Sequence, residues 1–240
     1  DNSTALNDGT YDNCTITVTD NASNTSDNLT VSEFTIGATK PALAEVTAVP
    51  NPTNDNTSNY TFFSTLPGRI DYGVICTSDN DTAVADNNTI TFNVLAEGTY
   101  DNCTISVTSN GGVLSDNLSV SSFTIDITAP TLAETTLVPS LTNDNVTQYT
   151  FSSTEVGTFT IGGHCSNGSD NNTVVADNMT VSFAALPDGY YADCTITVTD
   201  SAGNTVTIDV NPFTIDTTAP ILAEVIAVPN RTNSDNASYT

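Results

Sequence analysis

The chain repeats itself with a period of about 90 residues. Residues 11–19, 100–108 and 191–199 read YDNCTITVT, YDNCTISVT and YADCTITVT, so that Cys14, Cys103 and Cys194 lie 89 and 91 residues apart. In each copy the cysteine, the isoleucine and the valine alternate with Thr or Ser. This period of two predicts a strand that is buried on one face. A sequence that recurs at a fixed spacing is one structural unit written several times.

The repeat predicts where the units begin and end. Residues 40–129 and 130–219 are two complete repeats, residues 1–39 are the C-terminal part of an earlier repeat, and residues 220–240 are the N-terminal strands of a further one. Each complete repeat holds six or seven short segments of alternating polarity, separated by Gly, Asn and Asp turns, and none has a helical period. This pattern predicts an all-β fold of sandwich domains placed end to end.

Alternation also predicts which side chains face the core. In the first complete repeat the inward residues of the second and fifth strands are expected to be Tyr60, Phe62, Ile90 and Phe92. The third strand is predicted from the alternation of Ile70, Tyr72, Val74 and Cys76. The last strand has inward residues Leu118, Val120, Phe123 and Ile125, and its spacing of two, three and two predicts a β-bulge. A short edge strand is expected within the polar residues 78–88.

The five cysteines form a pattern of one pair per repeat. We expect the disulfides Cys76–Cys103 and Cys165–Cys194, and we expect Cys14 to pair with a cysteine upstream of the sequence. Metal binding is the alternative, but two cysteines without a recurring histidine make a poor metal site. Disulfides predict an extracellular or cell-surface location.

The charge balance excludes some partners. The chain has 28 acidic residues against three basic ones, and its net charge is −25. Nucleic acids and anionic membranes bind basic patches, so we expect neither as a partner. The sequence contains no transmembrane run.

Four segments carry a resemblance to a known family. They are FTIDITAP at 123–130, FTIDTTAP at 213–220, LPDGYY at 186–191 and VTDSAGN at 198–204. With them the chain resembles the bacterial immunoglobulin-like (Big-type) tandem repeats of large surface proteins, adhesins and filaments. The resemblance implies tandem immunoglobulin-like β-sandwiches on an extracellular stalk. The first junction, FTIGATKP at 34–41, departs from the pattern at Gly37 and Lys40.

Asparagine sequons are the strongest chemical signal. Of the 28 asparagines, 17 lie in Asn-x-Ser/Thr, more than the Ser and Thr content gives by chance. Glycosylation needs an accessible amide, which outward strand faces and loops provide. The sites that we expect to carry covalent glycans are Asn13, Asn28, Asn80, Asn87, Asn102, Asn117, Asn145 and Asn178. The alternative is that a repeat rich in Asn and Thr produces sequons by composition alone.

Calcium is the one cofactor that the sequence leaves open. Junctions between sandwiches could gather Asp55, Asp126 and Asp200 in one place, and Asp144 and Asp216 in another. Clusters of carboxylates favour calcium. The alternative is that each aspartate serves the geometry of its own turn.

No residue set predicts catalysis. His164 is the only histidine and does not recur, so the many Ser and Thr hydroxyls lack a base. We therefore expect a non-enzymatic, structural segment of a stalk, fibre or adhesin shaft, with neighbouring repeats, like chains in a bundle and glycans as its partners. The alternatives are an adhesive module that recognises a receptor or glycan, and a self-associating filament or surface-layer subunit.

Overall fold

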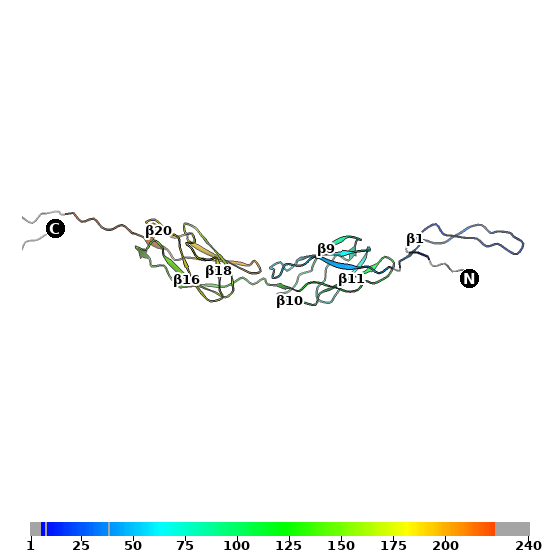
Figure 1. The fold of residues 1–240 in the computed structure, drawn as a ribbon, viewed down its shortest axis with the longest axis horizontal. Helices are drawn as coiled ribbons and strands as arrows, with labels where there is room; N and C mark the ends of the chain where they lie inside the picture. Colours follow the sequence, from blue (N-terminus) through cyan, green and yellow to red (C-terminus); the bar gives the residue numbers. More distant parts are fainter. Residues whose placement is uncertain (1–5, 8, 38, 224–240) are drawn as a thin grey trace, which may run out of the picture. The chain divides into compact units, whose positions relative to one another are not determined.

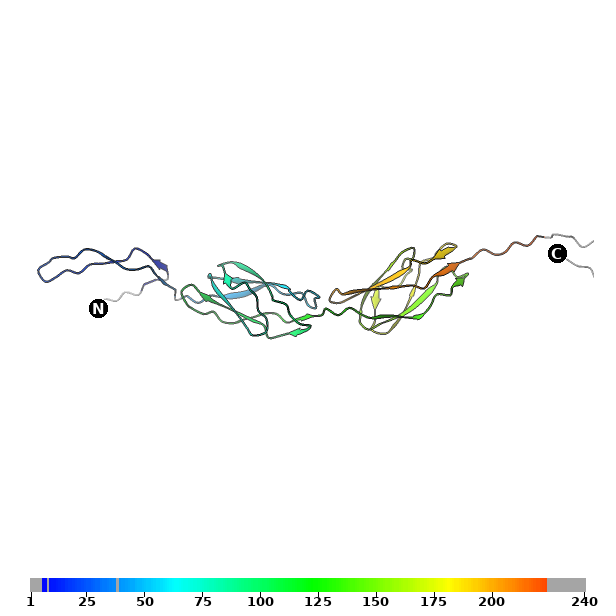
Figure 2. The same cartoon turned by 180° about the vertical axis from the view of Figure 1, so that it is seen from behind.

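The computed structural model describes residues 6–7, 9–37 and 39–223, and the elements in this part of the chain are all strands. Figure 1 labels some of these strands, and Figure 2 gives the reverse view. The chain forms two compact units. One extends to Ala129 and includes Ser201–Asn204, and the other contains the remaining residues from Pro130 onward. The strands predicted for residues 220–240 lie, from residue 224, outside the described residues.

The first described segment is a long hairpin. Its strands are β1 (Gly9–Tyr11), β2 (Thr15–Ile16), β3 (Leu29–Thr30) and β4 (Phe34–Ile36). Strand β1 pairs with β4 and β2 with β3, both antiparallel.

The first sandwich has two main sheets. One has the order β5 (Leu43–Thr47), β6 (Asn59–Ser64) and β9 (Asn87–Thr91). The other has the order β12 (Leu118–Ser119), β11 (Thr104–Ser109), β7 (Gly68–Tyr72) and β8 (Thr82–Ala83). A separate pair joins β10 (Gly98–Tyr100) to β13 (Phe123–Ile125). Strand β8 confirms the edge strand expected within residues 78–88.

The second sandwich repeats this topology. One sheet contains β14 (Leu132–Thr136), β16 (Gln148–Ser153) and β19 (Asn178–Ser182). The facing sheet has the order β18 (Thr173–Val174), β17 (Gly157–Gly162), β21 (Thr195–Asp200) and β22 (Thr205–Asp209). A third sheet contains β15 (Leu141–Thr142), β23 (Phe213–Ile215) and β20 (Gly189–Tyr191), in which β15 and β23 are parallel.

Aromatic and branched side chains fill each core as the alternation predicts. Tyr60, Phe62, Ile90 and Phe92 are all buried in the first sandwich. In the second, Tyr149, Phe151, Val181 and Phe183 are buried in the same way. Each of these Tyr and Phe side chains removes a large apolar area from water. The chain has no Trp, so Tyr and Phe are its only aromatic core residues.

Two strand predictions need correction. The third strand ends at Tyr72, and the chain bends between Tyr72 and Cys76. Because the alternation stops there, Val74 is fully exposed and the prediction that it faces inward is wrong. The repeated cysteine strand is also not continuous, since residues 101–103 separate β10 from β11. The last strand is interrupted opposite this gap, between β12 and β13, where the bulge was expected.

Candidate functional site

The two complete repeats each carry one disulfide. Cys76 is bonded to Cys103 and Cys165 to Cys194, with Cα–Cα distances of 5.4 and 5.3 Å. In the first sandwich the bond lies beyond the end of β7 and just ahead of β11, two strands that pair in one sheet. Cys14 forms no disulfide with any residue that the structure describes.

A tyrosine corner occurs in all three copies. The hydroxyl of Tyr100 donates to the carbonyl of Ala96 at 2.8 Å, and Tyr191 donates to Pro187 at the same distance. In the hairpin Tyr11 donates to Asn7 at 2.9 Å. Each tyrosine also stacks on a phenylalanine of the last strand, with ring centroids 5.2–5.3 Å apart. In each copy the tyrosine lies three residues before the cysteine, one more than in antibody domains.

Glu45 joins the first strand to the last in the first sandwich. Its carboxylate accepts hydrogen bonds from the amide and hydroxyl of Ser121 at 2.9 and 2.6 Å, and from the hydroxyl of Tyr60 at 3.1 Å. Partial burial raises the pKa of Glu45, but the bonds from Ser121 and Tyr60 outweigh it and leave the pKa below its ordinary value. Burial, and then the charge of Glu45, raise the pKa of Tyr60. Sequence reasoning missed this cluster.

In each sandwich an asparagine side chain also connects the first-strand region to the last-strand region. The asparagine comes from the last-strand region in the second sandwich and follows the first strand in the first sandwich. Asn211, on the last strand of the second sandwich, accepts from the Val138 amide at 3.0 Å and donates to its carbonyl at 2.8 Å. In the first sandwich Asn51 lies after the first strand, and it accepts from the amide of Thr124 at 3.0 Å. Each side-chain amide therefore links the segment that follows the first strand to the region of the last strand.

The residues that leave each sandwich are bonded back to it. Thr128 donates its hydroxyl to Glu97 at 2.6 Å. In the second sandwich Asp188 accepts from the amide and hydroxyl of Thr217, at 2.9 and 2.7 Å, and from the hydroxyl of Thr218 at 2.7 Å. Bonds from Thr217, and then from Thr218, hold the pKa of Asp188 below its ordinary value. Sequence reasoning missed the bond between Glu97 and the linker.

Four of the five aspartates proposed for calcium accept a bond from the amide two residues on. Asp55 accepts from Thr57 at 2.9 Å and Asp144 from Val146 at 2.9 Å. Asp126 accepts from Thr128 at 3.2 Å, and Asp216 from Thr218 at 3.1 Å. These are the side-chain turns that the sequence offered as the alternative. Asp200 is buried at the end of β21. Calcium binding stays a prediction, and an unfolding midpoint that a chelator leaves unchanged would count against it.

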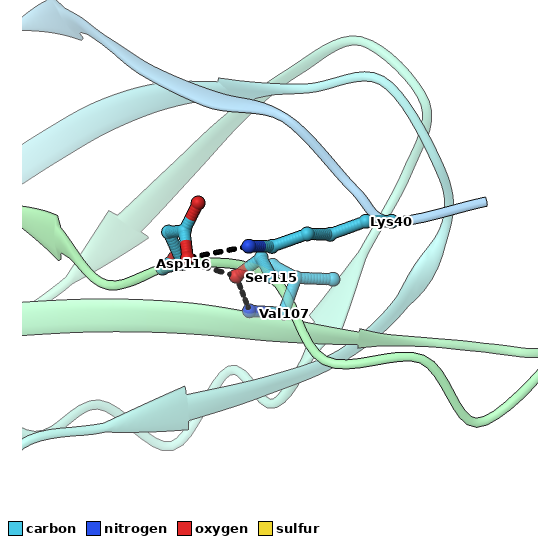
Figure 3. A network of polar contacts seen from close by, with 4 residues as sticks. All are labelled: Lys40, Val107, Ser115 and Asp116. Carbon is cyan, nitrogen blue, oxygen red and sulfur yellow. Dashed lines mark hydrogen bonds and ion pairs between the residues drawn. The ribbon is translucent and has the colours of Figure 1, made fainter.

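The first junction has its own chemistry, as Gly37 and Lys40 suggested. Lys40 forms an ion pair with Asp116 (Figure 3). Next to it, the buried hydroxyl of Ser115 accepts from the Val107 amide at 2.9 Å and donates to the carbonyl of Asp116 at 2.8 Å (Figure 3). Gly37 lies so close to Gly111 that a Cβ on Gly37 would be 2.6 Å from the Gly111 Cα. A side chain at Gly37 would therefore require the backbone to move.

The serine of this network recurs in the hairpin, where Ser26 accepts from the Val18 amide at 3.0 Å and donates to the Asp27 carbonyl at 3.0 Å. In the second sandwich no serine is needed, because Val206 pairs with Val198 in the continuous strand β22. This difference explains why β22 has five residues whereas β12 has two.

All eight asparagines proposed for glycosylation are exposed. Asn87 begins β9 and Asn178 begins β19, at the same place in the two sandwiches. Asn80 lines an open hollow of about 410 Å³ together with Thr89, Thr91 and Asn93. Accessibility meets the first requirement of the modification, and occupancy stays a prediction.

His164 and Asp193 form a pair beside the second disulfide. The His164 Nδ1 lies 2.6 Å from the Asp193 carboxylate. Desolvation raises the pKa of Asp193, but the bonds from His164 outweigh it and lower the pKa overall. Both side chains are solvent-exposed, and the pair replaces the sequon that Asn102 forms in the first sandwich.

The described residues include no helix long and apolar enough to cross a membrane. No protein-family model matches the sequence, and no curated protein matches it. A solved structure of the Clostridium thermocellum CbhA fibronectin(III)-like modules is similar, with a TM-score of 0.41 and 9% identity, over 72% of this chain and 94% of that chain. A likeness this distant carries no argument, so the class of the protein rests on its own strands. They define an all-β protein with immunoglobulin-like sandwiches, and the two disulfides fit an extracellular structural module.

Proposed function

We propose that this chain is a segment of an extracellular stalk, fibre or adhesin shaft, made of disulfide-bonded and N-glycosylated immunoglobulin-like repeats. The observation that carries the proposal is that each sandwich binds the linker leaving it, through Glu97 and Thr128 in the first and through Asp188 in the second. A passive tether would not need these bonds.

The bonds matter because they restrict the exit of the chain. The threonines precede Pro130 and Pro220, and proline fixes its own φ and restricts the residue before it. A linker that is hydrogen-bonded to the sandwich and stiffened by proline bends less than a free linker would. The reach of such a chain increases with the number of repeats.

Surface chemistry supports an exterior location. The eight candidate asparagines are exposed, and glycans there would cover strand edges and loops. The net charge of −25 keeps such a surface hydrated and opposes collapse onto neighbouring chains. The three Lys and Arg residues leave few sites for trypsin-like proteases.

The proposal is tested by the motion of the linkers. We expect backbone order parameters of about 0.8 or more at Thr128, Thr217 and Thr218, as in a rigid backbone. Values below about 0.6 would show a flexible tether and overturn the shaft. Glycosylation is tested separately, by peptide mass spectrometry of native material at Asn87 and Asn178. Bare asparagine at both sites would remove the glycans from the proposal.

An adhesive role is the second candidate, and one residue favours it. Tyr190 is 69% exposed on β20, at the place where the other two copies carry Thr10 and Thr99. An exposed aromatic ring in one copy alone is the kind of divergence that a binding surface would have. A Tyr190→Thr variant should then lose retention on an immobilised glycan panel, and equal retention of both proteins would reject this role for Tyr190.

A further inference from the structure

One of the eight candidate asparagines differs from the others in the second half of its sequon. A sequon requires a Ser or Thr hydroxyl two residues after the asparagine. Asn145 is exposed, but Thr147, which supplies this hydroxyl, is only 3% exposed, and its Oγ1 is buried. In the sequons of the other seven candidates the hydroxyl residue is exposed or half-buried. In the folded chain, therefore, the Asn145 sequon alone among the eight has a buried hydroxyl residue.

Backbone hydrogen bonds hold this sequon against the core of the second sandwich. The carbonyl of Asn145 accepts from the Leu186 amide at 2.9 Å, and the carbonyl of Thr147 accepts from the Phe183 amide at 3.0 Å. Leu186 and Phe183 are both buried core residues. Thr147 forms part of the wall of an open hollow of about 440 Å³, but its hydroxyl oxygen is closed off from that space. The hydroxyl becomes accessible only when this turn separates from the core.

The first sandwich has a buried hydroxyl at the same place, with a structural role. Ser58, which lies 89 residues before Thr147, is 1% exposed and donates its hydroxyl to the Asp55 carbonyl at 2.6 Å. The hydroxyl of Thr147 makes no hydrogen bond within the described residues. Burying a hydroxyl without a partner is unfavourable. The folded second sandwich thus gains no stability from this hydroxyl, whereas the sequon requires it.

We propose that Asn145 accepts an N-linked glycan only before the second sandwich folds. In the unfolded chain the Asn145 amide and the Thr147 hydroxyl can both enter a transferase. The amide nitrogen then bonds to the anomeric carbon of the sugar, the bond from that carbon to the phosphate of the sugar donor breaks, and the amide loses one proton. Because the Asn145 side chain is at the surface of the folded chain, the attached glycan does not obstruct folding. The inference rests on the proposed glycosylation and adds the order of modification and folding.

The test compares folded and unfolded forms of the second sandwich as acceptors. The 240-residue chain is made in a host without N-glycosylation and is incubated with a soluble N-glucosyltransferase and UDP-glucose. In the unfolded counterpart, Phe151→Asp and Phe213→Asp place charges in the core, and rapid amide exchange confirms the unfolding. Asn171 is the internal control, because Asn171 and the Thr173 of its sequon are both exposed in the folded chain.

Peptide mass spectrometry measures glucose at each asparagine over time. We expect similar rates at Asn171 in both chains, and a rate at Asn145 that is higher by about tenfold or more in the unfolded chain. Equal rates at Asn145 in the two chains would overturn the proposal. So would an Asn145 that stays bare in the unfolded chain, or an Asn171 that is modified only after unfolding. Because the enzyme is supplied, bare asparagines in native material would remove the proposed glycans without changing this result.

A second variant separates the sequon from a structural role of the hydroxyl. Thr147→Val keeps the shape of the side chain and removes the hydroxyl, so Asn145 should stay bare even in the unfolded chain. The Tm of the second sandwich should not fall, because the hydroxyl makes no hydrogen bond within the described residues. The matched control is Ser58→Ala, which removes the bond to Asp55 and should lower the Tm of the first sandwich. A comparable loss for Thr147→Val would show that the fold needs this hydroxyl and would contradict the reasoning.

Discussion

Replacing Glu45 with alanine tests whether one carboxylate holds the first and last strands of the first sandwich together. The variant leaves the buried hydroxyl of Tyr60 without its acceptor and removes two bonds from Ser121. Hydrogen bonds to a charged group contribute about 1.5–3 kcal/mol when they are buried. Because Ser121 is exposed, we assign a smaller value of about 1 kcal/mol to each of the two partner residues, Tyr60 and Ser121. The first sandwich should therefore lose about 2 kcal/mol of unfolding free energy, or 8 °C or more in its Tm.

Calorimetry measures this loss, with hydrogen exchange assigning each transition to a sandwich. The matched control is Glu134→Ala, because Glu134 occupies the same place in the second sandwich but is exposed. The Tyr149 hydroxyl lies near the Glu134 carboxylate, and burial and then Glu134 raise the pKa of Tyr149, but the hydroxyl makes no hydrogen bond of normal geometry within the described residues. The control should lose less stability than Glu45→Ala, because Glu134 accepts no bond from the last strand in the described residues.

The pH dependence gives a second reading of the same bonds. The pKa of Glu45 is lowered in the folded state, so its stabilisation is complete above the unfolded pKa of about 4.3. It is lost as the pH falls through the folded pKa, because the folded carboxylate then takes up a proton as well. The difference between the parent protein and Glu45→Ala should shrink below about pH 4. Equal losses for Glu45→Ala and Glu134→Ala, or a difference that persists unchanged at pH 3, would refute the reasoning.

Three further predictions concern the corner, the linker and the disulfide. Tyr191→Phe removes the hydrogen bond from the buried Tyr191 to the Pro187 carbonyl, and it should lower the unfolding free energy measured by chemical denaturation by about 1 kcal/mol. The same change at the exposed Tyr190 should have no measurable effect on stability. Asp188→Ala should increase the NMR-detected motion of Thr217 and Thr218 while the Tm stays nearly constant. The control is Asp209→Ala at the exposed end of β22, which should change neither the motion of the threonines nor the Tm. Replacing both cysteines of the second sandwich by serine opens a loop with a sequence separation of 29 residues. It should lower the unfolding free energy by about 3–4 kcal/mol relative to the oxidised parent protein, whereas the reduced parent should be about as stable as the variant.

Local patterns predicted the parts of the fold that depend on local geometry. Tyr60 and Phe62 face the core because successive side chains of any strand point to opposite sides. The same rule placed Val74 inside and was wrong, because the chain had already left the strand at Tyr72. A period of two says which side a residue faces, but it does not say where pairing with the neighbouring strand ends.

Local sequence patterns could not predict the hydrogen bonds that link the first and last strands of a sandwich. Glu45 and Ser121 are 76 residues apart, and nothing near either one marks the other as its partner. The hydrogen bond of the tyrosine corner is easier to predict, since Tyr100 and Ala96 are only four residues apart and the tyrosine recurs in each copy. Even there, only the folded chain shows that the carbonyl lies within reach of the hydroxyl.

The sequence alone determined the repeat, most of the strand faces, the cysteine pairs of the two complete repeats and the exposure of the candidate asparagines. These follow from spacing, because strand geometry and a fixed period act over a few residues or recur at a known interval. The tertiary structure decided how the cysteine strand is split and which carboxylates hold the linkers. Those features depend on which distant strands meet and which side chains then come within about 3 Å, and no local pattern records that distance.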